Sequence, residues 1–159
     1  MPLPPYRQGR ILWARLRAQS GKKELHPSVI ITANRDIVQP EDFDPRHNLN
    51  AANAVAVIGV STEFAKYPPY VLLPYSPNKG GHALTKLTQA CGACIGWYDW
   101  VVLEDDVEGK GGDVPPAEMD QMMTAIAKDL TKKLKTKAAT MNQDLSQLHE
   151  LLALLIGEA

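Results

Sequence analysis

The stretch AVAVIGV, residues 54–60, is a short run of small and apolar residues that has the length of one strand. It is too short for an ordinary helix and is typical of a buried strand. Similar runs surround it, RILWARL at 10–16, SVIITA at 28–33 and YVLLP at 70–74, and a fifth candidate strand spans 93–103. Loops rich in Pro, Gly and Asn separate them, and no long helix lies between them. The series predicts a small β-barrel or sandwich rather than a doubly wound α/β fold.

The pattern changes after residue 114. Prolines at 115 and 116 and Glu118 predict a helix start, because Pro is tolerated in the first turn and Glu favours the positive end of the helix dipole. Apolar residues then follow helical spacing, so we expect a helix from Pro115 to about Lys135 that packs on the sheet. A second amphipathic stretch has leucines at 145, 148, 152 and 155. We therefore expect a domain at 1–137 and a helical extension at 138–159, which packs on the body or on a partner.

The charge is balanced overall but unevenly distributed. Seventeen Lys and Arg residues against eighteen Asp and Glu residues, in 159 residues, give a formal net charge of −1, which excludes a uniformly basic protein. Residues 1–23 contain six Arg or Lys and no acidic residue, whereas residues 99–120 contain eight acidic residues and one Lys. A basic end suits an anionic ligand such as a nucleic-acid backbone. The alternative is a solvated face on which charges cluster.

Several common signals are absent from the sequence. No apolar run approaches the length of a membrane span, and the first residues lack the apolar core of a signal peptide, so we expect a soluble, cytoplasmic protein without membrane contact. The four histidines lack metal-ligand spacing, and we expect neither a metal nor a cofactor. Cys91 and Cys94 form a CxxC pattern that enters a predicted strand, which favours structural cysteines over a redox pair.

An ordered series of motifs carries a family resemblance. It consists of PYRQGRILW at 5–13, HPSVII at 26–31, VIGVST at 57–62, YPPYV at 67–71 and GGDVP at 111–115. In this order and spacing, the chain resembles the PemK/MazF family of toxins from toxin–antitoxin pairs. The family pattern has a Gly-Asp-Ile/Val-Trp strand, an Arg-Pro-small-Val-Ile strand, a strand ending in Thr or Ser, a Tyr-Pro strand and a Gly-x-Leu/Val-Pro helix start.

The resemblance implies a fold and an activity. The fold is an SH3-like small β-barrel with a C-terminal helix, assembled as a homodimer. The activity is that of an endoribonuclease, which cuts single-stranded RNA, including mRNA, without a metal and inhibits growth. The products carry 2′,3′-cyclic phosphate and 5′-hydroxyl ends, and a small antitoxin protein blocks the RNA groove. Such a reaction needs a base, an acid and positive charge near the phosphorane, all of which side chains can supply.

The resemblance also assigns candidate residues. His26 stands where the family has a catalytic Arg, and the family's Thr corresponds to Ser61 or Thr62. A histidine shuttles protons better than arginine but gives weaker fixed charge. His26 is therefore either the acid–base catalyst or the mark of a barrel that binds RNA, gyrase or an antitoxin without cutting; a plain interaction module that docks a partner through its C-terminal leucines is a third interpretation. We expect the loop at 17–25 to overhang the site, with RNA bound by the basic residues Arg10, Arg15, Arg17, Lys22 and Lys23.

Overall fold

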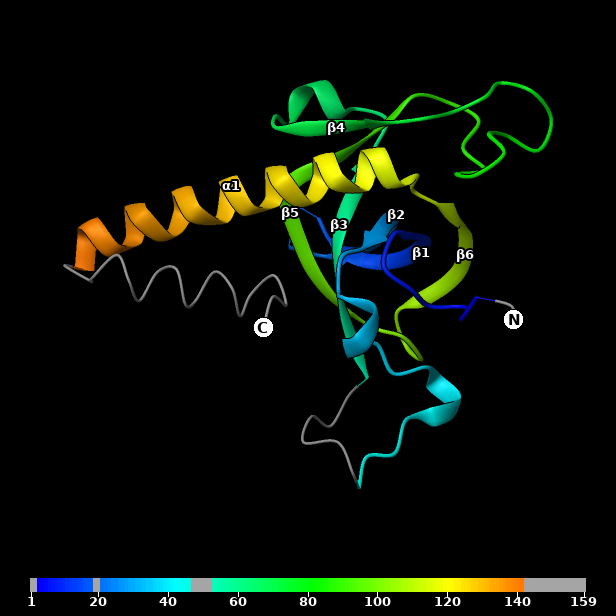
Figure 1. Ribbon diagram of the computed structural model, residues 1–159, viewed down its shortest axis with the longest axis horizontal. Coiled ribbons are helices and arrows are strands. Elements are labelled where there is room, and N and C mark those ends of the chain that lie inside the picture. Colours follow the sequence, from blue (N-terminus) through cyan, green and yellow to red (C-terminus); the bar gives the residue numbers. More distant parts are fainter. Residues whose placement is uncertain (1–2, 19–20, 47–52, 142–159) are drawn as a thin grey trace.

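The computed structural model describes residues 3–18, 21–46 and 53–141. They form one antiparallel sheet of six strands and a single long helix, with strand order β4-β5-β3-β2-β1-β6 (Figure 1). The mainly β class with a C-terminal helix is confirmed. The strands are β1 (Arg10–Arg17), β2 (Lys23–Ile30), β3 (Ala54–Ser61), β4 (Tyr70–Leu73), β5 (Cys91–Val102) and β6 (Val107–Asp113), and the helix is α1 (Pro116–Met141). Short 3₁₀ turns cover Asn34–Asp36, Pro40–Asp42 and Phe64–Lys66.

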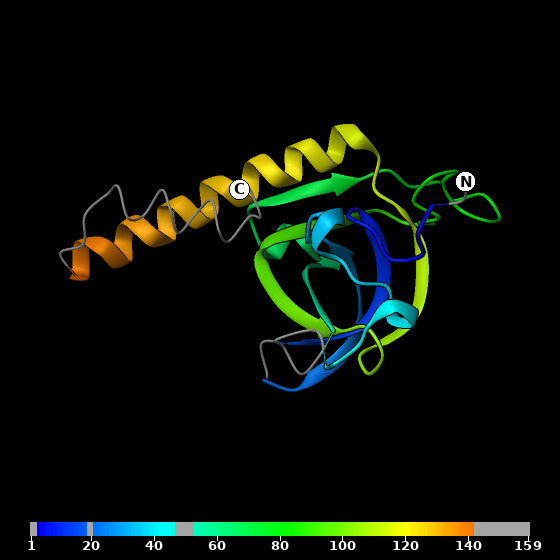
Figure 2. The ribbon, with the colours of Figure 1, turned by 60° about the horizontal axis from the view of Figure 1, so that its bottom comes forward.

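The sheet curls into a small barrel, with α1 lying along its outside (Figure 2). Within the described residues no ladder joins the two edge strands, β4 and β6, so the barrel is open on one side. Side chains nevertheless link strands that are not neighbours in the sheet. The indole Nε1 of Trp97 in β5 donates to the carbonyl oxygen of Arg17 in β1 at 3.0 Å, and Asp99 Oδ2 accepts the Arg17 N–H at 2.7 Å. These bonds hold the end of the β1–β2 hairpin against β5.

Two apolar clusters use opposite faces of the same strands. One cluster lies between the sheet and α1 and includes Ile58 together with Met122 and Ile126 of the helix. The other fills the inside of the curl and includes Leu12 and Val57. Because neighbouring residues of β3 belong to different clusters, β3 is buried on both faces. This explains why its sequence is a continuous apolar run rather than an alternating one.

The structure corrects the predicted limits of one strand and of the helix, and adds a strand that was not predicted. Strand β2 begins at Lys23 rather than at residue 28 and ends at Ile30, because the hairpin ladder with β1 continues to its last pair, Arg17 and Lys23. Strand β6 was not predicted, since its sequence VEGKGGD is rich in Gly and charge; it forms by backbone pairing with β1. Helix α1 continues to Met141, beyond the predicted end near Lys135. The boundary expected at 137/138 lies within this helix, and the leucine stretch at 145–155 lies outside the described residues.

Two other sequence expectations concern cysteines and membrane contact. Cys91 and Cys94 are buried and not bonded to each other, and burial raises the pKa of both thiols above the ordinary value. This agrees with structural cysteines. Among the helices that the structure describes, none is long and apolar enough to cross a membrane.

Candidate active-site groove

A groove opens where β2 and β3 separate. The two strands pair only from Ser28 to Ile30, and β2 continues toward Lys23 paired with β1 alone. On the other side, the β3–β5 register jumps, because Ile58 pairs with Tyr98 whereas Val60 pairs with Ala93. Residues 94–97 of β5 therefore form a bulge, a feature that bends a strand and redirects its side chains. The divergence and the bulge together leave a solvent-accessible groove of about 1060 Å³.

Three segments that are distant in sequence line this groove. The β1–β2 hairpin supplies its first wall, the connection from β3 to β4 its second, and the β5 bulge with the residues after it forms the floor. The lining residues are, in that order, Arg17, Ala18, Glu24 and His26; Ser61, Glu63, Lys66, Tyr67 and Pro68; and Cys94, Gly96, Trp97, Tyr98 and Asp99.

Trp97 forms a fixed aromatic surface in the floor. A methyl group at Gly59 of β3 would lie 2.1 Å from Cε3 of Trp97, so the six-membered ring of the indole rests directly on the backbone of this glycine. The hydrogen bond from Nε1 to Arg17 fixes the opposite edge of the ring. The ring of His26 meets Trp97 edge-on, with ring centroids 5.0 Å apart and an angle of 76° between the planes, a favourable aromatic arrangement.

His26 lies within β2, not before it as the sequence suggested, and its side chain is half-buried. Glu24 precedes it by two residues, so both side chains lie on the same face of the strand. The Nε2 atom of His26 is 3.5 Å from a carboxylate oxygen of Glu24. An imidazole in this position can exchange protons with a ligand in the groove, and Glu24 is placed to pair with the ring when it carries the additional proton.

The structure separates the two hydroxyl residues that the sequence left as alternatives. Ser61 lines the groove, and its Oγ accepts the backbone N–H of Glu63 at 2.9 Å. A serine hydroxyl that accepts one bond retains its own O–H as a donor. Thr62 is exposed in the turn that follows β3 and is not among the lining residues. The geometry therefore brings His26 and Ser61 to one groove and places Thr62 outside it.

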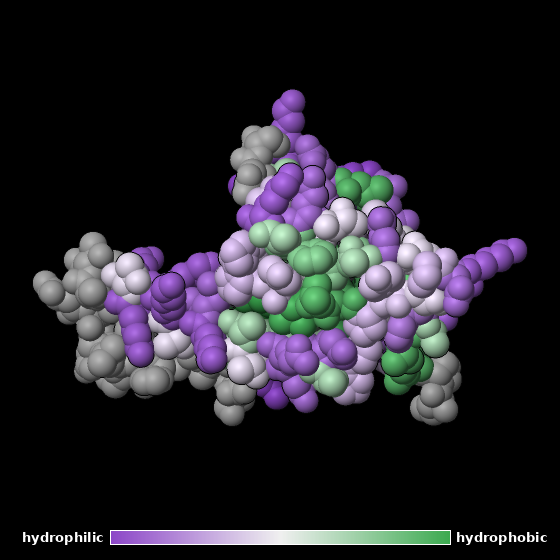
Figure 3. Space-filling view, turned by 90° about the horizontal axis from the view of Figure 1, so that it is seen from above, coloured by the Kyte–Doolittle hydropathy of each residue, from purple (hydrophilic) through white to green (hydrophobic). Residues whose placement is uncertain are grey.

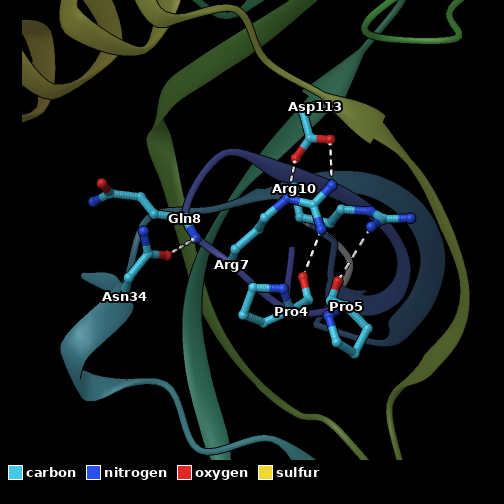
Figure 4. A network of polar contacts seen from close by, with 7 residues as sticks. All are labelled: Pro4, Pro5, Arg7, Gln8, Arg10, Asn34 and Asp113. Carbon is cyan, nitrogen blue, oxygen red and sulfur yellow. Dashed lines mark hydrogen bonds and ion pairs between the residues drawn. The ribbon is translucent and has the colours of Figure 1, made fainter. Parts of the chain in front are cut away.

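Most of the predicted RNA-binding cations lie outside the groove. Of the five, only Arg17 is a lining residue, and the exposed Lys22 is not one. Arg15 pairs with Glu108, and Lys23 Nζ lies 3.5 Å from Asp106 Oδ2. Arg10 donates to the carbonyl of Pro5 at 3.3 Å, and a neighbouring ion pair joins Arg7 to Asp113 through two hydrogen bonds of 2.9 and 2.6 Å (Figure 4).

The pairing of β1 with β6 explains why several of these cations have acidic partners. Because these strands are paired, basic side chains of the segment at 1–23 meet acidic side chains of the segment at 99–120 and are compensated by them. The pairs are Arg7 with Asp113, Arg15 with Glu108 and Lys23 with Asp106. The groove itself is not cationic. Its lining contains three carboxylates, from Glu24, Glu63 and Asp99, and two cations, Arg17 and Lys66. Lys66 is in turn 3.2 Å from Glu63.

Tyr98 connects the groove to α1. Its hydroxyl donates to Asp129 Oδ2 at 2.8 Å, and Lys133 Nζ lies 2.9 Å from the same oxygen and 4.9 Å from the centre of the tyrosine ring. Burial, the hydrogen bond to Asp129 and the charge of that carboxylate raise the pKa of Tyr98 far above its ordinary value, so the phenol stays protonated. Burial acts to raise the pKa of Asp129, but hydrogen bonds from Lys133 and Tyr98 and the charges of Lys133 and Lys132 outweigh it and lower that pKa.

Sequence reasoning missed Glu24, Trp97 and Tyr98 as site residues. Trp97 was recognised only as part of a strand, although the small residue at position 59 in an apolar strand is a signal for close approach by another group. No cluster of three or more His, Cys, Asp or Glu side chains suited to a metal ion occurs in residues 3–18, 21–46 and 53–141.

Comparison with known proteins gives similarity to solved structures alone, and it is distant. No protein-family model matches the chain, and no curated protein matches it. Among solved structures, a chain described as "Endoribonuclease from Mycobacterial species" is similar over 80% of this chain and 93% of that chain, with 16% sequence identity and a TM-score of 0.45. A similarity this distant transfers neither an activity nor individual residues.

Proposed function

We propose that this protein is a metal-independent endoribonuclease, the toxin of a toxin–antitoxin pair, and that it cleaves single-stranded RNA in the groove beside Trp97. The observation that carries the proposal is the position of His26. Its half-buried imidazole opens into a groove of nucleotide size, between the carboxylate of Glu24 and the indole of Trp97. The motif series shared with PemK/MazF toxins supports the same activity.

The proposed reaction is an internal transesterification of RNA. The ribose 2′-oxygen loses its proton and attacks the adjacent phosphorus, the bond from phosphorus to the 5′-oxygen breaks, and that oxygen gains a proton. His26 takes part in these proton transfers, because imidazole is effective as both acid and base near neutral pH. The Ser61 hydroxyl and the Arg17 guanidinium supply hydrogen-bond donors to the phosphoryl oxygens, and Trp97 and Tyr67 offer faces on which bases stack. The products carry a 2′,3′-cyclic phosphate and a 5′-hydroxyl.

The biological part of the proposal follows the resemblance. The protein acts on mRNA in the cytoplasm, inhibits growth, forms a homodimer and is blocked by a small antitoxin protein that covers the groove.

A second function has its own supporting observation. Three carboxylates outnumber two cations in the groove lining, and Arg15 and Lys23 are neutralised by the acidic residues near them. A groove of this charge is also compatible with a barrel that binds an antitoxin, gyrase or RNA without cutting. If the wild-type protein binds RNA, gyrase or an antitoxin but cleaves RNA in no condition, this second function is favoured.

The test is cleavage of a long RNA in EDTA by the purified full-length chain, with sequencing of the ends. We expect cleavage without added metal and a decrease of at least about a hundredfold in His26→Ala, the magnitude typical for loss of a general acid or base. Ser61→Ala should slow cleavage, whereas Thr62→Ala should not, because Thr62 is outside the lining.

The matched control is His82→Asn. The Nδ1 atom of His82 accepts the backbone N–H groups of Leu84 and Thr85 at 3.1 and 3.4 Å, and this histidine is not a groove residue. An asparagine oxygen can replace that acceptor, so this variant should fold and cleave normally. Equal cleavage by His26→Ala and the wild type would show that the activity does not use this site. A difference in urea unfolding between the two histidine variants would reveal a folding defect instead.

A further inference from the structure

The second half of α1 carries an excess of positive charge that the groove does not use. Residues 128–137 contain five lysines and one acidic residue, Asp129, which pairs with Lys133 at 2.9 Å. Lys128, Lys132 and Lys135 follow a spacing of four and three residues, so they lie on one face of the helix. All three are exposed, and none forms an ion pair with any residue that the structure describes. They border a shallow hollow of about 520 Å³.

We propose that Lys128, Lys132 and Lys135 form a docking stripe for the phosphate backbone of single-stranded RNA. The inference rests on the proposed function, because the RNA that binds to the stripe is the substrate that the groove cleaves. A rise of 1.5 Å per residue separates the first and last lysine by about 10 Å, enough to face more than one phosphate. The projecting part of α1 is hydrophilic on the face seen in Figure 3, in contrast to the hydrophobic centre of that view.

Tyr98 connects the groove to the helix that carries the stripe. Tyr98 lines the groove and donates to Asp129, which is the residue next to Lys128. Lys132 lies close enough to Asp129 to lower its pKa by charge interaction. Lys133 compensates the carboxylate of Asp129, so this contact presents little net negative charge to an approaching phosphate. An RNA strand that leaves the groove beside Tyr98 therefore passes α1 at Asp129, within range of the charge of Lys132, and can continue along the stripe.

Charge complementarity favours RNA over a membrane surface as the occupant. A helix that binds a bilayer inserts an apolar face opposite its lysines. In α1 that face is already occupied, because Met122 and Ile126 are buried against the sheet and Leu130 packs on the same cluster. The groove lining has more carboxylates than cations, so an RNA substrate needs positive charge from another part of the protein.

The experiment measures binding separately from cleavage. Fluorescence anisotropy with a short 2′-O-methyl RNA, which lacks the attacking hydroxyl, gives the affinity of the full chain over a range of NaCl concentrations. In the triple variant Lys128→Gln, Lys132→Gln and Lys135→Gln, we expect binding about tenfold weaker at moderate salt and a slope of log K against log[salt] that is flatter by about 2. The three corresponding Lys→Arg changes should restore both values.

The control removes the same charge elsewhere. Lys79, Lys86 and Lys110 are exposed and do not belong to α1, and their change to Gln should leave the salt slope close to the wild-type value. An equal effect of the two triple variants would mean that only net charge matters and would overturn the stripe, as would absence of RNA binding by the wild type. Preferential binding to phosphatidylserine vesicles, lost in the α1 variant, would also overturn it.

RNA cleavage is measured in parallel, so that the two proposals can fail separately. Intact cleavage with unchanged RNA binding in the α1 variant refutes the stripe alone. Stripe-dependent RNA binding without any cleavage refutes the proposed activity alone.

Discussion

Gly59→Ala is the sharpest perturbation of the groove floor. The new methyl carbon would lie 2.1, 2.3 and 2.7 Å from Cε3, Cδ2 and Cζ3 of Trp97. Carbon atoms prefer separations of about 3.5–4.0 Å, so the indole has to move by more than about 1 Å. This movement strains the contact with His26 and the hydrogen bond to Arg17. Overpacking of about 1–3 kcal/mol and a hydrogen bond of about 1 kcal/mol together give an expected destabilisation of about 2–4 kcal/mol.

The assay is urea unfolding followed by tryptophan fluorescence. Trp13 and Trp100 are both exposed, so their replacement by Phe leaves Trp97 as the sole tryptophan at low structural cost. We expect Gly59→Ala to shift the Trp97 emission to longer wavelength and to decrease His26-dependent RNA cleavage. The matched control is Gly96→Ala, because a methyl group at Gly96 meets no atom within 4 Å; its effect should stay within about 0.5 kcal/mol.

A double-mutant cycle tests the cause. After Trp97→Ala, the methyl group at position 59 has free space, so Gly59→Ala should then cost less than about 0.5 kcal/mol. Because Trp97→Ala also removes the tryptophan signal, unfolding in this arm of the cycle is followed by far-UV circular dichroism. The reasoning is refuted if Gly59→Ala is as mild as Gly96→Ala with Trp97 present. It is also refuted if its cost is unchanged when Trp97 is absent.

Two further predictions concern ion pairs outside the groove. Asp113→Asn should destabilise the fold by about 1–2 kcal/mol in urea, because Arg7 loses a two-bond partner, whereas Asp120→Asn on the exposed side of α1 should change little. The lowered pKa of Asp129 means that its contacts add stability that is complete above its ordinary value of 3.8 and is lost as the pH falls through the lowered value. Asp129→Asn should therefore lack part of the acid sensitivity that the wild type shows in thermal unfolding below about pH 4.

The strands that sequence alone could predict are those that bury side chains. The run at 54–60 belongs to both apolar clusters, so its hydrophobicity identifies it at once. Strand β6 has the opposite character. Its residues 107–113 bury little apolar surface, and the strand exists because β1 offers unpaired backbone groups and basic side chains along its edge. Pairing with backbone and charged groups of another strand cannot be predicted from the sequence of β6 alone.

The candidate site shows a similar division. His26 and Ser61 were accessible to motif comparison because each lies at a recognisable position on its own strand. Trp97 reaches the groove through the register jump between β3 and β5, and Glu24 joins it because β2 begins earlier than its apolar residues suggest. The net charge of the groove was the least predictable property. Counting charged residues along the sequence does not show that Arg7 and Asp113, which are 106 residues apart, are partners.

The strength of these ion pairs indicates which cations an anionic ligand can recruit. Arg7 and Asp113 form two hydrogen bonds, and the arginine side chain is only 16% exposed, so separating them is costly. Lys66 and Glu63 are 67% and 60% exposed, and exposed pairs typically contribute less than about 1 kcal/mol. A phosphate that enters the groove can therefore replace Glu63 as the partner of Lys66 at a small cost in free energy. It follows that Lys66 and Arg17, rather than the more numerous cations before residue 16, are the positive groups available to a substrate in the groove.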